Sequence, residues 1–168
     1  MKSPRSPIIL LIILVISIFV ARPLAAKAIG DHHSLSSQTY RASGRNGSLT
    51  AQVSLTVEPL PPRSHIYALY RMHSDYVPQT GITAINIRVD GREIYVPFSA
   101  VADMMDISKM SVRPERGGFV LLLSGGDGSE AYAARLSFNR SRVYRKTLSP
   151  TGQSSWTERT DYRVVTVD

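Results

Sequence analysis

Apolar and polar residues alternate strictly from Leu49 to Glu58, and this alternation is the clearest pattern in the chain. Successive side chains of a β-strand point to opposite faces, so the pattern predicts a strand with one buried face and one solvated face. Pro59 follows directly, and proline cannot donate to a strand ladder. The apolar positions of this predicted strand are Leu49, Ala51, Val53, Leu55 and Val57.

A β-hairpin is predicted from residue 82 to residue 98, with its turn at Asp90-Gly91. A two-residue Asp-Gly loop favours the turn type whose twist matches that of paired strands. This turn also places the apolar residues of both strands on one face, so the hydrophobic pattern and the turn chemistry agree. The expected pairs are Val89 with Arg92, Ile87 with Ile94, and Ile85 with Val96.

One short helix is predicted from Ser99 to Met105. Ser99 is a suitable N-cap, and Val101, Met104 and Met105 make one apolar face at helical spacing. A helix of about two turns is marginal by itself in water. We therefore expect this helix to dock on a sheet through its apolar face.

Most of the remaining chain has the pattern of short strands separated by glycine, proline and small polar residues. Turns at hairpin spacing predict an antiparallel β-sandwich or a small β-barrel of about eight strands with one short helix. Residues 29–48 have no periodicity and are predicted to be a flexible polar leader, so a single β-rich domain would span residues 49–168. Further strands are expected at 65–72, 107–112, 119–123, 132–138, 143–148 and 156–167.

Residues 1–28 are predicted to be a cleavable signal peptide. Lys2 and Arg5 precede an apolar run from Ile8 to Val20, and a stretch of small residues follows. The run is shorter than the roughly 20 residues that a membrane-spanning helix needs, so the mature form is not expected to span a membrane. The sequence therefore predicts an exported protein that is periplasmic or secreted.

Export would also change the charge of the protein. The whole chain has a formal net charge of +7, but residues 1–28 hold four basic side chains and no acidic one, so the remainder carries +3. A charge this small gives no reason to expect a nucleic-acid partner. The chain has no cysteine, so it has no disulfide framework and must rest on packing and sheet hydrogen bonds.

No catalytic, cofactor or metal site is predicted. His32 and His33 are adjacent, but neighbouring side chains of an extended chain point apart, and His65 and His73 are distant in sequence. A Gly-x-Ser-x-Gly nucleophile motif is absent. Carboxylates for a glycosidase-like pair are present, but their spacing selects no particular pair.

A glycine-rich loop is the first candidate for partner binding. Its three glycines allow close approach of another backbone, whereas in the alternative interpretation they serve only the geometry of a hairpin loop. The candidate residues are Ser124, Gly125, Gly126, Asp127, Ser129 and Tyr132. This loop, followed by a tyrosine, resembles the protruding loop with which some exported bacterial lysozyme inhibitors enter an enzyme cleft.

A strip of basic residues is the second candidate. Arg140, Arg142 and Arg145 lie at or just after a predicted turn, with Arg135 and Lys146 close in sequence. Such a strip is suited to an acidic protein or an anionic envelope glycan. The alternative is a charged face that keeps sheet edges from pairing with other chains.

Together these features favour an exported, envelope-associated binding or accessory protein without catalytic activity. It would be inhibitor-like in using the loop and the basic strip against an acidic protein or a glycan. The first alternative is a structural or scaffold protein of the envelope, whose β surface assembles with other chains. The second alternative is a small hydrolase. No cofactor is expected, and no pattern in the sequence identifies the partner.

Overall fold

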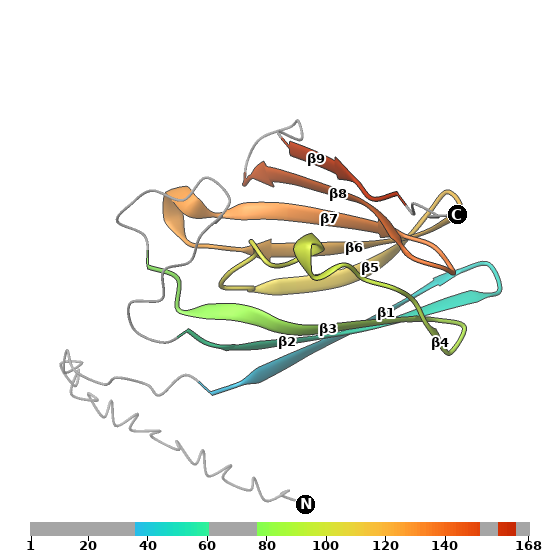
Figure 1. Cartoon of the computed structure of the whole chain (residues 1–168), viewed down its shortest axis with the longest axis horizontal. Coiled ribbons are helices and arrows are strands. Elements are labelled where there is room, and N and C mark those ends of the chain that lie inside the picture. The colour runs from blue at the N-terminus through green and yellow to red at the C-terminus, as the bar shows by residue number, and fades with distance from the viewer. Residues whose placement is uncertain (1–35, 61–76, 152–157, 164–168) are drawn as a thin grey trace, which may run out of the picture. The chain divides into compact units, whose positions relative to one another are not determined.

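The computed structural model describes residues 36–60, 77–151 and 158–163 (Figure 1). Within these ranges the protein is mainly β, with nine strands in two antiparallel sheets and no helix of seven or more residues. None of the helices in these ranges is long and apolar enough to cross a membrane. The predicted signal peptide and the predicted strand at 65–72 lie outside the described residues.

The first sheet has four strands in the order β1-β2-β3-β4. β2 is the strand predicted from the strict alternation, and its inward residues from Ala51 to Val57 are at most 3% exposed. The prediction for this strand is confirmed. The strands are β1 (Gln38–Asn46), β2 (Leu49–Pro59), β3 (Thr80–Val89) and β4 (Arg92–Glu93).

β1 corrects the prediction of a flexible leader over residues 29–48, which is wrong for residues 38–46. This segment pairs with β2 along its whole length, from Gln38 opposite Val57 to Asn46 opposite Leu49. Its inward residues are Tyr40, Ala42, Gly44 and Asn46, and only the first two are hydrophobic, so the hydrophobic pattern was weak. The polar inward side chain of Asn46 forms hydrogen bonds with the other sheet, because its amide donates to the carbonyl oxygens of Gly118 and Glu115 at 2.7 and 2.9 Å.

The second sheet has five strands in the order β5-β6-β7-β8-β9. In β6, Phe119, Val120 and Leu121 are all buried, so this strand is covered on both faces, as its continuous apolar run predicted. The strands are β5 (Lys109–Glu115), β6 (Gly118–Gly125), β7 (Tyr132–Phe138), β8 (Val143–Pro150) and β9 (Glu158–Asp161).

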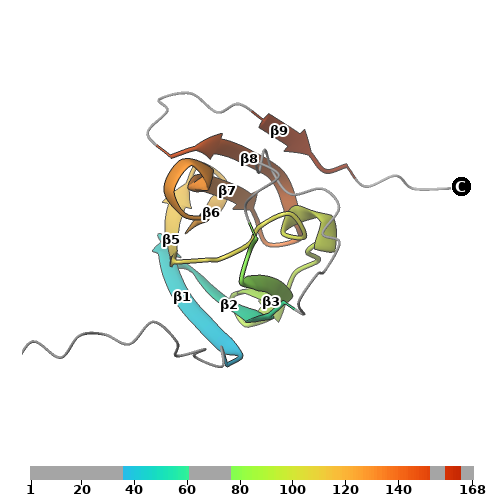
Figure 2. The same ribbon diagram turned by 90° about the vertical axis from the view of Figure 1, so that its left-hand side faces the viewer.

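Both sheets contribute to one hydrophobic core, and β1 lies beside β5 where their edges meet (Figure 2). Leu55 and Ile87 enter this core from the first sheet, and Leu121 and Leu136 enter it from the second. Each of these side chains is fully buried, which stabilises the fold by about 1.5–3 kcal/mol per side chain. Because the chain has no cysteine and so no disulfide bond, the fold depends on this packing for its stability.

The hairpin turn is present where the sequence predicts it. Asp90 and Gly91 have φ angles of 50° and 78°, and Val89 lies opposite Arg92. The regular ladder ends at Glu93, which is earlier than expected, although the Ile94 N–H still donates to the Ile87 carbonyl oxygen at 3.0 Å, as the predicted pairing of these two residues implies. The reason is tertiary, because the backbone of the next exposed residue, Tyr95, bridges to Arg142 near the start of β8.

Replacing Gly91 with alanine is expected to lower the free energy of unfolding by about 1 kcal/mol, because a Cβ is disfavoured at positive φ. A Cβ at this position would meet no other atom within 4 Å, so the effect comes from the backbone alone. Gly91→Asn is the matched control, since asparagine tolerates this conformation and should stay close to the wild type. Urea unfolding measures both variants; equal losses would contradict the explanation.

The predicted helix at 99–105 is wrong. The segment contains only a 3₁₀ turn, η1 (Phe98–Ala100), although Val101, Met104 and Met105 are buried as expected. Two long-range contacts override helix formation here. Met105 bridges to Gly81 of β3, and Asp103 forms an ion pair with Lys146 of β8. A helix of two turns has too little stability of its own to resist such contacts.

Candidate functional site

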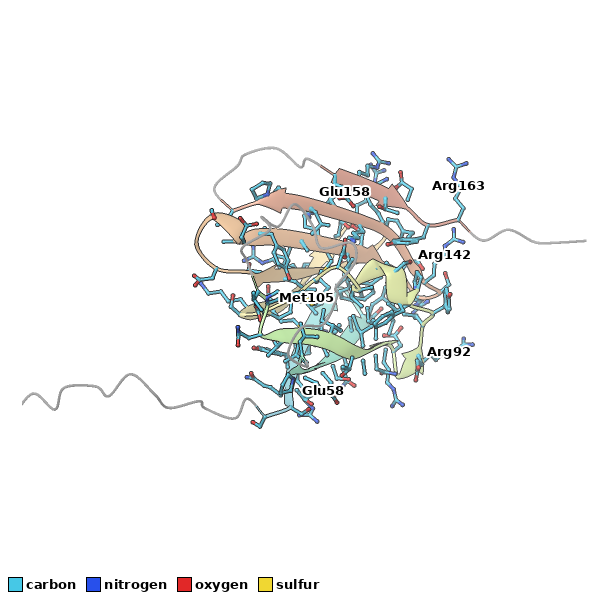
Figure 3. The ribbon with its side chains drawn as sticks, turned by 60° about the vertical axis from the view of Figure 1, so that its left-hand side comes forward. Glu58, Arg92, Met105, Arg142, Glu158 and Arg163 are labelled. Carbon is cyan, nitrogen blue, oxygen red and sulfur yellow. The ribbon has the colours of Figure 1, made fainter. Side chains whose placement is uncertain are left out.

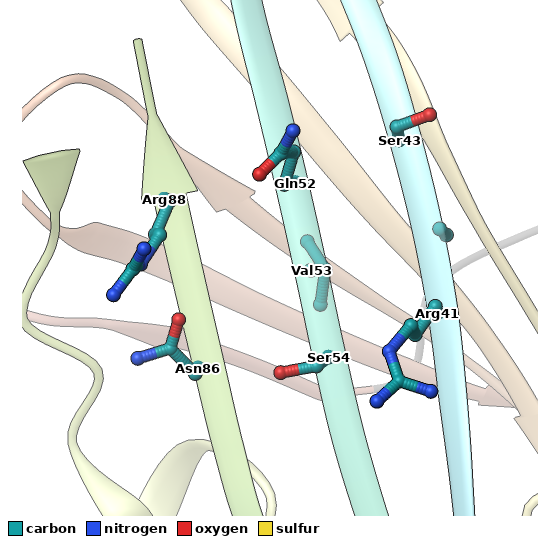
Figure 4. A pocket seen from close by; sticks show the side chains of 8 residues that line it. Arg41, Ser43, Gln52, Val53, Ser54, Asn86 and Arg88 are labelled. Atoms are coloured by element: carbon teal, nitrogen blue, oxygen red, sulfur yellow. The ribbon is translucent and has the colours of Figure 1, made fainter. Parts of the chain in front are cut away.

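A hollow of about 660 Å³ lies on the outer face of the first sheet, over β1, β2 and β3 (Figure 4). Two rows of polar side chains cross these strands, as the strand register requires. Each row has an arginine at one end, and the two arginines stand at opposite corners of the hollow. The first row is Arg41, Ser54 and Asn86, and the second is Ser43, Gln52 and Arg88.

The hollow is positively charged. Arg41 and Arg88 are both exposed, and neither forms an ion pair with any carboxylate in the described ranges. The described residues that line the hollow include no aspartate or glutamate. Each guanidinium has five N–H donors in a planar fork, which suits the two oxygens of a carboxylate or a phosphate.

The remaining lining residues supply neutral hydrogen-bonding groups. Gln52 and Asn86 present amides, and Ser43 and Ser54 present hydroxyls, so donors and acceptors are both available. Among the described lining residues there is no histidine, cysteine or carboxylate that could serve either serine as a general base. Across the part of the chain that the structure describes, no three potential metal ligands form a group.

The glycine-rich loop, the first candidate from the sequence, has largely structural features. Gly126 has a φ of 73°, and a Cβ there would overlap the carbonyl oxygen of Glu130. Tyr132 is 2% exposed and donates its hydroxyl to the carbonyl oxygen of Met105 at 2.8 Å, so it is not on the surface. Ser124 and Gly125 belong to β6, and only Asp127 and Ser129 are exposed among the candidate side chains.

The basic strip, the second candidate, is mostly paired with acids. Arg140 contacts Asp90 at 2.8 Å, and the Thr50 N–H together with this arginine holds the pKa of Asp90 below its usual value. Arg145 contacts Asp161 at 2.9 Å. The hydrogen bond from Arg145, and to a lesser degree the one from Arg159, lowers the pKa of Asp161. The positive charge expected from the sequence is therefore largely neutralised at these two positions.

The loop and the turn arginines are also far apart. The loop precedes β7 and the turn with Arg142 follows it, and a strand of seven residues spans roughly 20 Å. In Figure 3, Arg142 lies toward the opposite end of the molecule from Met105, the residue that Tyr132 contacts beside the loop. The structure therefore does not bring the two predicted groups into one surface.

Lys146, the last residue of the basic strip, is not on the surface. It faces inward, is 3% exposed, and donates to both carboxylate oxygens of Asp103 at 2.6 and 2.5 Å. Tyr162 lies nearby, and burial raises the pKa of its phenol. On the outer face Arg135 contacts Glu115 at 3.1 Å. Tyr144 also lies near Glu115, and its pKa is raised mainly by burial and secondly by the negative charge of Glu115.

Sequence reasoning missed the hollow because its residues come from three separate predicted segments. Arg41 and Ser43 fell in the predicted leader, Gln52 on the solvent face of a predicted strand, and Arg88 in the predicted hairpin. One signal was present. From Thr39 to Arg45 every second residue is polar with a hydroxyl or a guanidinium, which is the spacing of a solvated strand face.

No protein-family model, curated protein or solved structure matches this chain. The geometry of the described residues therefore carries the functional inference by itself.

Proposed function

We propose that this protein is an exported, envelope-associated binding protein that holds an anionic glycan in the hollow on the outer face of its first sheet. In this proposal residues 1–28 are a signal peptide that is removed on export, and the mature form acts in the periplasm or outside the cell. The two sheets, arranged as a sandwich or small barrel, serve as a rigid support and perform no chemistry.

The observation that carries the proposal is the position of Arg41 and Arg88 at opposite corners of one hollow, where neither has a carboxylate partner among the described residues. The two arginines face each other across neutral hydrogen-bonding groups, whereas Arg113, which also lacks such a partner among the described residues, lies outside the hollow. A ligand that supplies negative charge would complete this arrangement with charge-assisted hydrogen bonds, which are the stronger kind.

The lining favours a glycan over an acidic protein. The centre of a protein interface is rich in aromatic and other apolar side chains, which supply most of the binding energy. The large exposed hydrophobic side chains of the described residues are Val77, Tyr95 and Phe98, and none of them lines the hollow. Serine, glutamine and asparagine side chains match the many hydroxyl groups of a sugar chain.

The double variant Arg41→Gln, Arg88→Gln is expected to weaken binding of polygalacturonate, a simple carboxylated glycan, by at least about a hundredfold. Each lost charge-assisted hydrogen bond is worth about 1.5–3 kcal/mol, which is about tenfold or more in affinity. Titration calorimetry at low salt measures the change. Wild-type binding should also weaken with added sodium chloride, because the arginines are exposed to screening.

Arg113→Gln is the matched control, since Arg113 is an exposed strand arginine on β5, outside the hollow, with no ion pair to any described carboxylate. It should keep wild-type affinity. The proposal fails if the control weakens binding as much as the double variant, if neither changes it, or if the wild type binds no anionic glycan and instead captures an acidic protein.

A further inference from the structure

The two arginines of the hollow are placed to bind two separate charges. Arg41 lies on β1 and Arg88 on β3, so two strand spacings separate them, and their rows differ by two residues along the strands. With strands about 4.8 Å apart and about 3.4 Å per residue, the two Cα atoms are about 12 Å from each other. This separation leaves room for a separate anionic group at each guanidinium.

The surroundings of the two arginines are similar. Next to Arg41 in its row stands Ser54 of β2, and next to Arg88 stands Gln52 of β2. The line from Arg41 to Arg88 crosses the three strands diagonally. Each end of this diagonal thus offers one guanidinium and one neutral hydrogen-bonding side chain. Figure 4 shows Gln52 and Ser54 between the two arginines, where they would lie beneath the middle of a ligand on the diagonal.

We propose that the ligand is a repetitive polyanionic glycan that crosses the three strands diagonally and bridges Arg41 and Arg88. This inference rests on the proposed function and adds the ligand class: a chain with regularly spaced negative charges and hydroxyl groups between them. Because the two ends of the site are similar, each can bind the same kind of charged unit, and a polymer repeats such a unit along its length. The second contact is then intramolecular, so affinity rises steeply once the chain is long enough to span the diagonal.

The test is a length series of galacturonic acid, from the monomer to the hexamer, titrated into the wild type and into Arg41→Gln, Arg88→Gln and the control Arg113→Gln. The hexamer is expected to bind the wild type and the control about a hundredfold more tightly than the monomer does. Either single variant in the hollow should remove this length advantage, because the hexamer then finds only one arginine of the pair. Unchanged thermal unfolding midpoints confirm that the variants are folded.

The outcomes separate this inference from the proposed function. If the wild type binds the monomer and the hexamer equally, or if the length advantage survives in both single variants, the ligand does not bridge the two arginines. Binding in the hollow would still stand in that case, provided the double variant abolishes it. If no member of the series binds the wild type, both the bridging mode and the proposed function are overturned.

Discussion

Replacing Asp103 with alanine is expected to destabilise the fold by about 3–5 kcal/mol, because it leaves the charge of Lys146 buried without a partner. The Lys146 side chain is only 4% exposed, so its ammonium group has little access to water once the carboxylate is removed. The ion pair also joins the turn that follows η1 to β8 across 43 residues of sequence. Urea unfolding followed by circular dichroism measures the loss.

Two controls isolate the role of the buried charge. Asp161→Ala makes the same substitution in the exposed ion pair with Arg145, and its effect should be much smaller because water screens both groups. The double variant Asp103→Ala, Lys146→Met removes both charges and should recover most of the lost stability. If the double variant is no more stable than Asp103→Ala, the uncompensated charge is not the cause.

Replacing Phe138 with alanine is expected to cost about 3–5 kcal/mol of stability, because the change leaves a cavity in the core. Phe138 is completely buried, and its ring stacks on Phe119 with centroids 5.7 Å apart. The loss combines transfer of the ring to water with the contacts that Phe119 and the surrounding strands no longer make. The midpoint and slope of urea unfolding measure it.

Phe98→Ala is the matched control for the cavity, since Phe98 is 56% exposed and makes no comparable contact within the core. Its loss of stability should be within about 0.5 kcal/mol of zero. Phe138→Leu should fall between the two alanine variants, because it keeps part of the buried volume. A Phe98→Ala variant as unstable as Phe138→Ala would contradict the assignment of the core.

The parts of the fold that could be predicted from sequence have a strong local signal. Alternation over β2, the continuous apolar run of β6 and the Asp90-Gly91 turn each depend on residues close together in the chain, and each is present in the structure. β1 has only Tyr40 and Ala42 as hydrophobic inward residues, so its own pattern is weak and its pairing with β2 fixes its structure. The predicted helix failed for the opposite reason, because contacts of Asp103 and Met105 with distant strands override a local preference.

The candidate site, too, depends on contacts between distant segments that the sequence pattern does not show. Sequence showed that the chain is rich in arginine, but whether an arginine is neutralised depends on which acid lies beside it in space. Arg140 and Asp90 are 50 residues apart in sequence, and only the fold brings them together. The sequence by itself therefore determined the β class, the buried strand faces and the main hairpin turn, because side-chain periodicity and turn chemistry are local. Only the tertiary structure decided the pairing of β1, the loss of the helix and the two-arginine hollow, because strand register and ion pairing join residues from distant segments.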